Sequence, residues 1–305
     1  MKSTISFPVL LTALLLANGA AQAQVGGTGT LAQRIGHYDP AKVAHQTAVH
    51  DGAGSMQFGP ILGARSLSTN LIFMHRGVIN PHSGIGQHFH NHSEEMFVIL
   101  EGPDTQFTIN GRTAVLPTPS GAPDRIGSAH GIYNPSDKPL QWLNINVGLS
   151  KNYDNFDLGD DLVGNTIDKV PQFINMHLDR KLLKDAPAWL NATGAVQYRR
   201  TLDPTVFFTP WSFVDHILIS KGGKMAPAAS PIMSEAYYIM SGEGTVTVEG
   251  ETQPIKQGDA IPVDLNQSQS FSQTGDAPLE ILSIGVAKDM ESKEAYIKST
   301  FPQRR

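Results

Sequence analysis

Of the 11 histidines in the chain, a dense group lies between His75 and His92. Within this group, His88 and His90 alternate along a strand-like segment, so their side chains share one face of the chain. Glu95 follows after a short turn that could bring it back toward them, and His130 comes later, in the segment GSAHGIYN. Three imidazoles and one carboxylate suit a first-row divalent metal. The sequence therefore predicts one metal site with coordination positions left open for water, substrate or oxygen.

Two alternatives to this prediction remain open. The histidines could form an exposed surface cluster, or a structural metal site that is closed to substrate. Within the predicted site, His90 and His92 repeat the spacing of His88 and His90, so His92 could replace His88 as a ligand. Glu95 would then follow too early for the pattern, and we expect His92 to lie beside the site or to be exposed.

The segments that carry these residues are short and strand-like. Examples are residues 70–74, 95–100, 106–109 and 141–147, each bounded by Gly, Pro, Asn or Ser. The composition agrees, because 29 Gly and 20 Pro with 17 % charged residues favour strands and turns over a helix bundle. Strand-like sequence resumes over residues 206–286. We expect helices only at 174–183 and 288–300.

The two strand-rich blocks repeat each other. The segment Glu95–Gly102 (EMFVILEG) matches Glu235–Gly242 (EAYYIMSG), with a glutamate and a glycine at the same spacing. In both blocks a Gly turn follows, ING at 109–111 and VEG at 248–250, and then a proline. The matching order predicts duplication of one β-domain.

These motifs resemble those of the cupin family. His88-x-His90-x4-Glu95-x6-Gly102 resembles the first cupin motif, and Gly111-x5-Pro117 with Gly127-x2-His130-x3-Asn134 resembles the second. The resemblance implies an all-β fold of two double-stranded β-helix (jelly-roll) barrels in tandem. It also implies that His88, His90, Glu95 and His130 bind the metal inside the first barrel. We expect a metal-binding cupin over 51–150, a mostly irregular or helical connector over 151–203, and a degenerate cupin over 204–297.

The sequence departs from the cupin pattern within the first block. His82 replaces the usual first glycine, and an insertion, TPSGAPDRI, separates Pro117 from Gly127. We expect the insertion to form a loop at the mouth of the first barrel, where Arg125 could contact substrate, although a neutral surface loop is equally consistent.

The second block has lost most of the predicted ligands. Alignment on Glu235 places Ala228 and Ser230 at the positions of His88 and His90. Alignment on Pro262 places Gln267 at the position of His130 and Phe271 at that of Asn134. One carboxylate cannot hold a catalytic metal alone, so we expect a structural second barrel. Binding of a ligand without a metal is the alternative.

A few further residues are candidates for catalysis or substrate binding. Arg76 lies on the apolar strand LIFMHRGVI, so it must face either solvent or a polar cavity, where it would bind a substrate carboxylate. His92 and Tyr133 could transfer protons. Gln87 could line the pocket. Along residues 142–147, Trp142, Asn144 and Asn146 alternate with apolar residues, and one of the two sets must face the barrel interior.

Three functions are compatible with this site. The first is a dioxygenase-type oxidoreductase that uses Fe or Mn and acts on a small oxygen-rich substrate, either a carboxylate or an enolisable hydroxy-ketone. The second is a non-redox lyase, decarboxylase or isomerase that uses Zn, Ni or Mn. The third is a ligand-binding cupin without turnover.

The remaining expectations concern location and partners. Residues 1–23 have the positive start, short apolar core and Ala-Gln-Ala site of a signal peptide, which predicts a periplasmic or secreted protein, with a retained anchor as the alternative. Residues 24–50 are expected to be an exposed leading segment, and no membrane span remains after cleavage. The chain has no cysteine, and its net charge of -5 without a basic block argues against nucleic-acid binding. We expect a small-molecule substrate, and a homo-oligomer formed through the cupin sheets is an open alternative.

Overall fold

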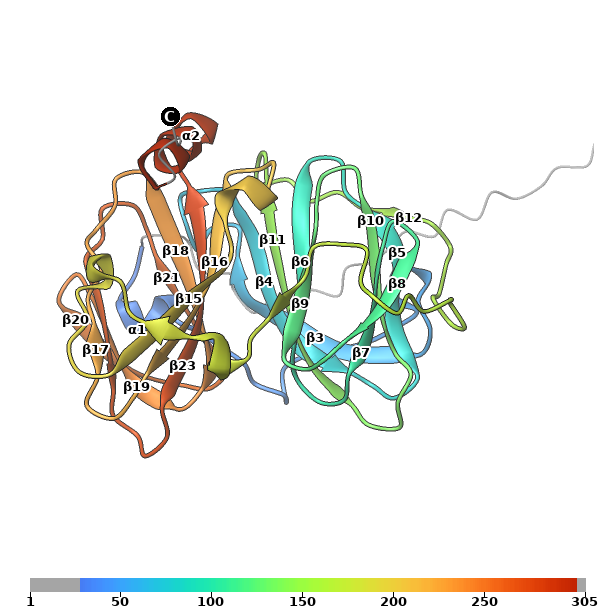
Figure 1. The fold of residues 1–305 in the computed structure, drawn as a ribbon, viewed down its shortest axis with the longest axis horizontal. Coiled ribbons are helices and arrows are strands. Elements are labelled where there is room, and N and C mark those ends of the chain that lie inside the picture. Colours follow the sequence, from blue (N-terminus) through green and yellow to red (C-terminus); the bar gives the residue numbers. More distant parts are fainter. Residues whose placement is uncertain (1–27, 301–305) are drawn as a thin grey trace, which may run out of the picture.

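Two β-barrels lie side by side in a computed structural model that describes residues 28–300 (Figure 1). The predicted signal peptide, residues 1–23, lies outside the described residues. Within the described range, no helix has the length and apolar character needed to cross a membrane.

The first barrel consists of β2 (Ala44–Thr47), β3 (Ser55–Gly63), β4 (Leu71–Ile79), β5 (Ser83–Phe89), β6 (Ser93–Glu101), β7 (Thr105–Ile109), β8 (Arg112–Leu116), β9 (Ser120–Asp124), β10 (Ala129–Asn134), β11 (Leu140–Gly148), β12 (Phe156–Asp157) and β13 (Met176–His177). A seven-stranded sheet in the order β13-β9-β6-β11-β4-β3-β2 faces a five-stranded sheet in the order β12-β5-β10-β7-β8. Apolar side chains from both sheets, including Ile85, Phe97 and Ile132, fill part of the interior. The expected jelly roll is confirmed.

The second barrel repeats this arrangement with β1 (Gly36–His37), β14 (Lys184–Asp185), β15 (Val196–Leu202), β16 (Trp211–Ile219), β17 (Lys224–Met225), β18 (Met233–Ser241), β19 (Glu243–Val248), β20 (Glu251–Lys256), β21 (Asp259–Val263), β22 (Gln269–Gln273) and β23 (Leu279–Ala287). Its sheets have the orders β1-β21-β18-β23-β16-β15-β14 and β17-β22-β19-β20. The described helices are α1 (Leu31–Arg34), α2 (Met290–Thr300) and the 3-10 turns η1 (Val49–Asp51), η2 (Arg180–Leu182), η3 (Ala188–Leu190) and η4 (Pro204–Val206).

The leading segment and the connector contribute to both barrels. Strand β1 pairs with β21 of the second barrel, whereas β2, a few residues later, pairs with β3 of the first. In the connector, β13 pairs with β9 of the first barrel and β15 with β16 of the second. The domain boundaries remain a prediction, but both segments join the barrels in space.

The helix expected over 174–183 is not observed. This segment contains β13 and the single turn η2 instead. Met176 and Leu178 are both buried in the core between the barrels, and this two-residue period is that of a strand. The helix expected near the C-terminal end is present as α2, and it packs against η4 and β23.

The two seven-stranded sheets pack against each other through a shared apolar core. Leu143, Ile145 and Val147 of β11 meet Val214 of β16 and Leu282 of β23 in this core. Since side chains alternate along β11, Trp142, Asn144 and Asn146 face the interior of the first barrel. The packing of the second barrel thus determines which face of β11 is available to a site.

Arg76 lies at this interface and not in the metal site. Its guanidinium donates to the Tyr238 hydroxyl at 2.8 Å, to Gln141 Oε1 at 2.5 Å and to the Trp142 carbonyl at 3.2 Å. The hypothesis that Arg76 binds a substrate carboxylate at the metal is therefore corrected: its donors are occupied by the protein. The reason is alternation, because Met74 and Arg76 face the second barrel while Phe73 and His75 face inward.

A buried ion pair lies at the same interface. Glu280 of β23 accepts hydrogen bonds from His216 Nε2 at 2.7 Å and from Arg180 Nε at 3.0 Å. Burial alone would raise the pKa of Glu280, but the hydrogen bonds from His216 and Arg180 outweigh burial and lower the pKa to about 2. Removing one charged group of such a pair leaves the charge of the other group buried without compensation.

We expect Glu280→Gln to lower the melting temperature at pH 7 by about 2–6 °C, because the buried His216 and the half-exposed Arg180 lose their anionic partner. The pKa of this carboxylate is lower in the folded protein than in the unfolded chain, so the carboxylate stabilises the fold at pH values above its unfolded-state pKa. This stabilisation is lost as the pH falls from the unfolded-state pKa toward the folded-state pKa. The difference from the parent should therefore narrow between pH 5 and pH 3. Thermal unfolding followed by circular dichroism measures it.

Glu294→Gln is the control, because Glu294 forms an exposed pair with Lys298 on α2 and such pairs contribute little. Equal melting-temperature differences for Glu280→Gln at pH 7 and pH 3 would contradict the assignment.

Candidate metal centre

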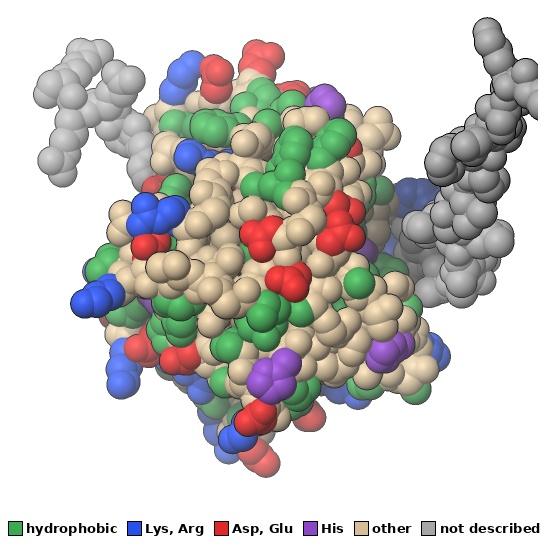
Figure 2. Space-filling view, turned by 90° about the vertical axis from the view of Figure 1, so that its right-hand side faces the viewer, with side chains coloured by type: hydrophobic (Ala, Val, Ile, Leu, Met, Phe, Trp, Pro, Cys, Tyr) green, Lys and Arg blue, Asp and Glu red, His purple; other side chains and the backbone are tan. Residues whose placement is uncertain are grey.

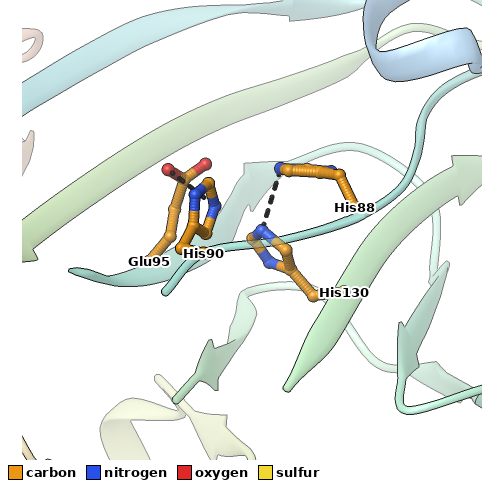
Figure 3. A group of neighbouring side chains, drawn as sticks. All are labelled: His88, His90, Glu95 and His130. Atoms are coloured by element: carbon orange, nitrogen blue, oxygen red, sulfur yellow. Dashed lines mark hydrogen bonds and ion pairs between the residues drawn. The ribbon is translucent and has the colours of Figure 1, made fainter. Parts of the chain in front are cut away.

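The four predicted ligands come together inside the first barrel (Figure 3). Strand β5 pairs with β10 so that His88 lies directly opposite His130, and His90 comes just after the end of β5. Glu95 reaches the same point from β6. Each residue offers one ligand atom within 4.8 Å of the others. All four side chains are buried, with exposed fractions of 0 % for His88, 0 % for His90, 2 % for Glu95 and 1 % for His130.

The donor set fits a divalent ion. The Nε2 atoms of His88 and His130 lie 3.1 Å apart, and His90 Nε2 lies 3.5 Å from Glu95 Oε2. Neighbouring ligand atoms bound to one ion at about 2.1 Å would be separated by about 3 Å. Burial lowers the pKa of His88 and of His130, which favours the neutral imidazoles that bind metals. His90 Nε2 is buried without a hydrogen-bond partner among the described residues, as expected of an atom reserved for an ion.

Backbone carbonyls orient two of the imidazoles. His88 Nδ1 lies 2.8 Å from the Gly86 carbonyl, and His90 Nδ1 lies 2.5 Å from the Asp154 carbonyl. A proton on Nδ1 that is donated to a carbonyl leaves Nε2 as the ligand atom on the inner side. Asp154 belongs to the connector, so the connector helps to position His90.

Two asparagines hold the carboxylate ligand. Asn144 Nδ2 donates to Glu95 Oε1 at 2.6 Å, and Asn146 Nδ2 donates to Oε2 at 2.7 Å. Both asparagines lie on the inward face of β11. This strand pairs with β6 and places Asn146 opposite Glu95. The two amides fix the plane of the carboxylate.

The structure adds two residues that the sequence pattern did not reveal. His50 of η1 stacks on His88 with ring centroids 3.8 Å apart, and its Nδ1 lies 2.6 Å from Asp157 Oδ1. His50 and Asp157 occur in the leading segment and the connector, where no periodicity or motif spacing marks them. Only the folded chain brings them to the metal centre.

A third residue missed by the sequence, Asp124, lies inside the barrel opposite Glu95. Its exposed fraction is 0 % and neither carboxyl oxygen has a hydrogen-bond partner among the described residues. Burial first, and then the charges of Glu95 and Glu94, raise the pKa of Asp124 to about 9.

The other predicted site residues lie elsewhere. His92 is exposed over 66 % of its side chain and contacts Asp154 Oδ2 at 3.2 Å, as expected for a residue beside the site. Tyr133 alternates with the inward-facing Ile132 on β10 and faces away from the centre. Gln87 accepts a hydrogen bond from the Gly111 amide outside the barrel. With Arg76 at the interface, none of these residues lines the cavity beside Glu95.

The insertion is not a loop at the barrel mouth. Its central residues form β9, which pairs with β6 on one side and β13 on the other, and all five residues of β9 are buried. Small side chains such as Ser120, Gly121 and Ala122 allow this close packing within the sheet. The Arg125 guanidinium lies 4.9 Å from the centre of the Phe208 ring, at the second barrel, and does not reach the metal centre.

The second barrel has a different register from the one expected. His130 pairs with Ile109 on β7, and Gln269 pairs with Val248 at the equivalent place on β19. Gln269, not Gln267, therefore occupies the position of His130, and by the same shift Gln273, not Phe271, occupies that of Asn134. The alignment failed because the proline equivalent to Pro262 is Pro123 and not Pro117: Pro262 pairs with Ala236 as Pro123 pairs with Met96. Glu235 accepts hydrogen bonds from Tyr237 and Ser283, so its carboxylate already has protein partners.

Comparisons with known proteins agree with this architecture. The family model described as "Cupin domain" matches residues 216–285, within the second barrel. A curated relative, the oxalate-binding protein of Thermotoga maritima, is 42 % identical over 50 residues, which cover 16 % of this chain and 41 % of that protein. The match thus spans less than half of that relative.

Solved structures share the fold over most of the chain. The oxalate decarboxylase of Lactobacillus farciminis, solved as a formate complex, has a TM-score of 0.60 at 14 % identity, covering 92 % of this chain and 96 % of that one. A salicylate 1,2-dioxygenase variant of Pseudoaminobacter salicylatoxidans, in complex with gentisate, has a TM-score of 0.54 at 16 % identity, covering 78 % and 74 %. Protein Ylba of E. coli has a TM-score of 0.58 at 13 % identity, covering 87 % and 94 %.

We expect His130→Ala to abolish stoichiometric metal binding, because one imidazole is removed from a four-ligand set. The metal content of protein purified without added metal, measured by inductively coupled plasma mass spectrometry, should fall from about one ion per chain to near zero. His92→Ala is the matched control, and it should retain the metal. Retention of metal by His130→Ala would show that the ion binds elsewhere.

Asn146→Ala should weaken metal affinity by about 10- to 100-fold, because Glu95 loses a hydrogen bond that orients its Oε2. Competition with a chromogenic chelator measures the change. Asn165→Ala serves as the control, since Asn165 makes only a 3.5 Å contact with Thr113 far from Glu95. Equal affinities of Asn146→Ala and the parent would contradict a positioning role.

Proposed function

We propose that this tandem cupin protein is a metal-dependent enzyme that acts on a small oxygen-rich organic molecule, as a dioxygenase-type oxidoreductase using Fe or Mn. The observation that carries the proposal is the combination of four buried ligands with an adjoining cavity of about 310 Å³, whose wall includes Glu95. A divalent metal at this position supplies Lewis acidity, a template for substrate oxygens and access to oxygen chemistry.

The chain's own residues supply binding, orientation and exclusion of water. Phe58, Phe73, Phe97 and Trp142 form an apolar wall beside Glu95 and keep the site dry. His88 and His130 come from one sheet, His90 follows the end of β5 in that sheet, and Glu95 comes from the other sheet, so the ligand atoms converge from two sides. A ligand cage built on paired strands is held more rigidly than one built on loops.

The comparisons support this class of function without identifying the reaction. One protein of similar fold is a salicylate dioxygenase and another is an oxalate decarboxylase. These activities belong to those proteins, and the low identity transfers only the fold. The metal-ligand cluster in this chain is an independent argument for chemistry in the first barrel.

A non-redox lyase, decarboxylase or isomerase that uses Mn, Ni or Zn is the second candidate. The observation that favours it is His50 in the cavity wall, which stacks on His88 and forms a hydrogen bond with Asp157. An imidazole oriented by a carboxylate is a suitable group for moving a proton to or from a bound substrate.

Oxygen uptake separates the two candidates. With protein loaded with Fe(II), we expect an oxygen electrode to record consumption that depends on an added substrate from a panel of hydroxy-ketones, phenols and small carboxylates. His130→Ala should abolish the consumption, whereas His92→Ala should retain it. Turnover at an unchanged rate without oxygen would support the second candidate, and binding without turnover in either condition would support a ligand-binding protein.

We also propose that the chain is exported. The signal-like sequence of residues 1–23 and the absence of cysteine support this location. In a bacterial host, the protein recovered from the periplasm or medium should have the mass of a chain whose first residue is Gln24. A full-length chain retained in the cytoplasm would contradict export.

A further inference from the structure

The size and the wall of the cavity beside Glu95 indicate which kind of molecule it binds. It has a volume of about 310 Å³, at the small end for ligand pockets, which suits one or two fused rings. Its wall is mainly aromatic: Phe58, Phe73, Phe97, Trp142 and Tyr153. Tyr153 is 40 % exposed and so lies at the rim, while Trp142 is 1 % exposed and lies deep inside. Aromatic walls favour a flat ligand.

Among residues 28–300, no lysine or arginine lines this cavity. Arg76, on the neighbouring strand position, faces the other way and its donors are engaged at the interface. Burial lowers the pKa of His75 to about 4, so this imidazole is neutral at pH 7. A ligand carboxylate in the part of the cavity that lies away from the metal centre would therefore be buried without a cationic side chain beside it, which is costly.

The surface at this end of the molecule also disfavours anions. Figure 2 shows the end formed by the first barrel, where Asp and Glu side chains gather near the centre and Lys and Arg lie around the rim. Connector carboxylates are near the cavity, because Asp157 contacts His50 of the cavity wall and Asp154 contacts His92. A field of negative charge lowers the local concentration of anionic substrates.

Two polar atoms in the cavity wall have no protein partner. Trp142 Nε1 is buried and unpaired among the described residues, and this atom can only donate a hydrogen bond. Asn144 is 5 % exposed. Its Nδ2 donates a hydrogen bond to Glu95, whereas its Oδ1 is a buried acceptor without a partner among the described residues. Buried polar atoms are rarely left unpaired unless a ligand or water completes them.

From these features we propose that the cavity binds a planar, uncharged hydroxy-ketone or phenol and selects against carboxylates, with Trp142 Nε1 donating to a substrate oxygen. The inference rests on the proposed function, because it concerns the substrate of the same metal centre. It chooses between the two substrate classes that the ligand set alone leaves open.

Isothermal titration calorimetry on Mn(II)-loaded full-length protein tests the inference with two probes of similar size. Maltol is an uncharged ring with adjacent hydroxyl and carbonyl oxygens, and salicylate is a ring with a hydroxyl and a carboxylate. We expect maltol to bind at least tenfold more tightly than salicylate. Trp142→Phe keeps an aromatic ring but removes the hydrogen-bond donor, and this variant should bind maltol about fivefold more weakly than the parent.

Trp189→Phe is the matched control, because Trp189 is 48 % exposed and is not part of the cavity wall; this variant should bind maltol as the parent does. His75→Arg places a cation in the wall and should raise the affinity for salicylate relative to maltol by at least fivefold. Salicylate binding as tightly as maltol, or no effect of Trp142→Phe at full metal occupancy, would overturn the inference. Loss of metal from the parent protein would instead reject the proposed function, so the two failures are distinguishable.

Discussion

The convergence of four buried ligand atoms is the constraint on which the rest of the site depends. Polar atoms in a barrel interior must be paired, and the pairing here is directional. Carbonyls take the Nδ1 sides of His88 and His90, and the amides of Asn144 and Asn146 hold Glu95. The remaining ligand atoms of these four residues lie within 4.8 Å of one another, so that one ion could contact all of them.

The second barrel and the two non-barrel segments support this constraint from outside. The shared core buries one face of β11 and so commits the other face, with its asparagines, to the first barrel. The connector supplies the Asp154 carbonyl and Asp157, and the leading segment supplies His50. A barrel that has lost its own ligands thus still contributes to the metal centre, because it determines which face of the shared sheet is polar.

The sequence was sufficient to predict that His88, His90, Glu95 and His130 gather in one cluster and that the chain forms two β-barrels, because both depend on short-range regularities. His88 and His90 alternate on one strand, and the Glu95–Gly102 pattern recurs at Glu235–Gly242. The features that escaped prediction depend on pairing between distant segments. The strand character of β9 depends on its neighbours β6 and β13, and the place of Gln269 depends on its register with β19. Neither is encoded in local spacing.

Formal charge links the metal centre to the character of its cavity. Neutral imidazoles and the Glu95 carboxylate would leave a bound divalent ion with one net positive charge. One deprotonated hydroxyl on a ligand would cancel this charge, whereas a carboxylate that also loses its hydroxyl proton would bring an excess negative charge into an apolar wall. An uncharged molecule that releases one proton on binding therefore matches both the ligand set and the absence of cations around it.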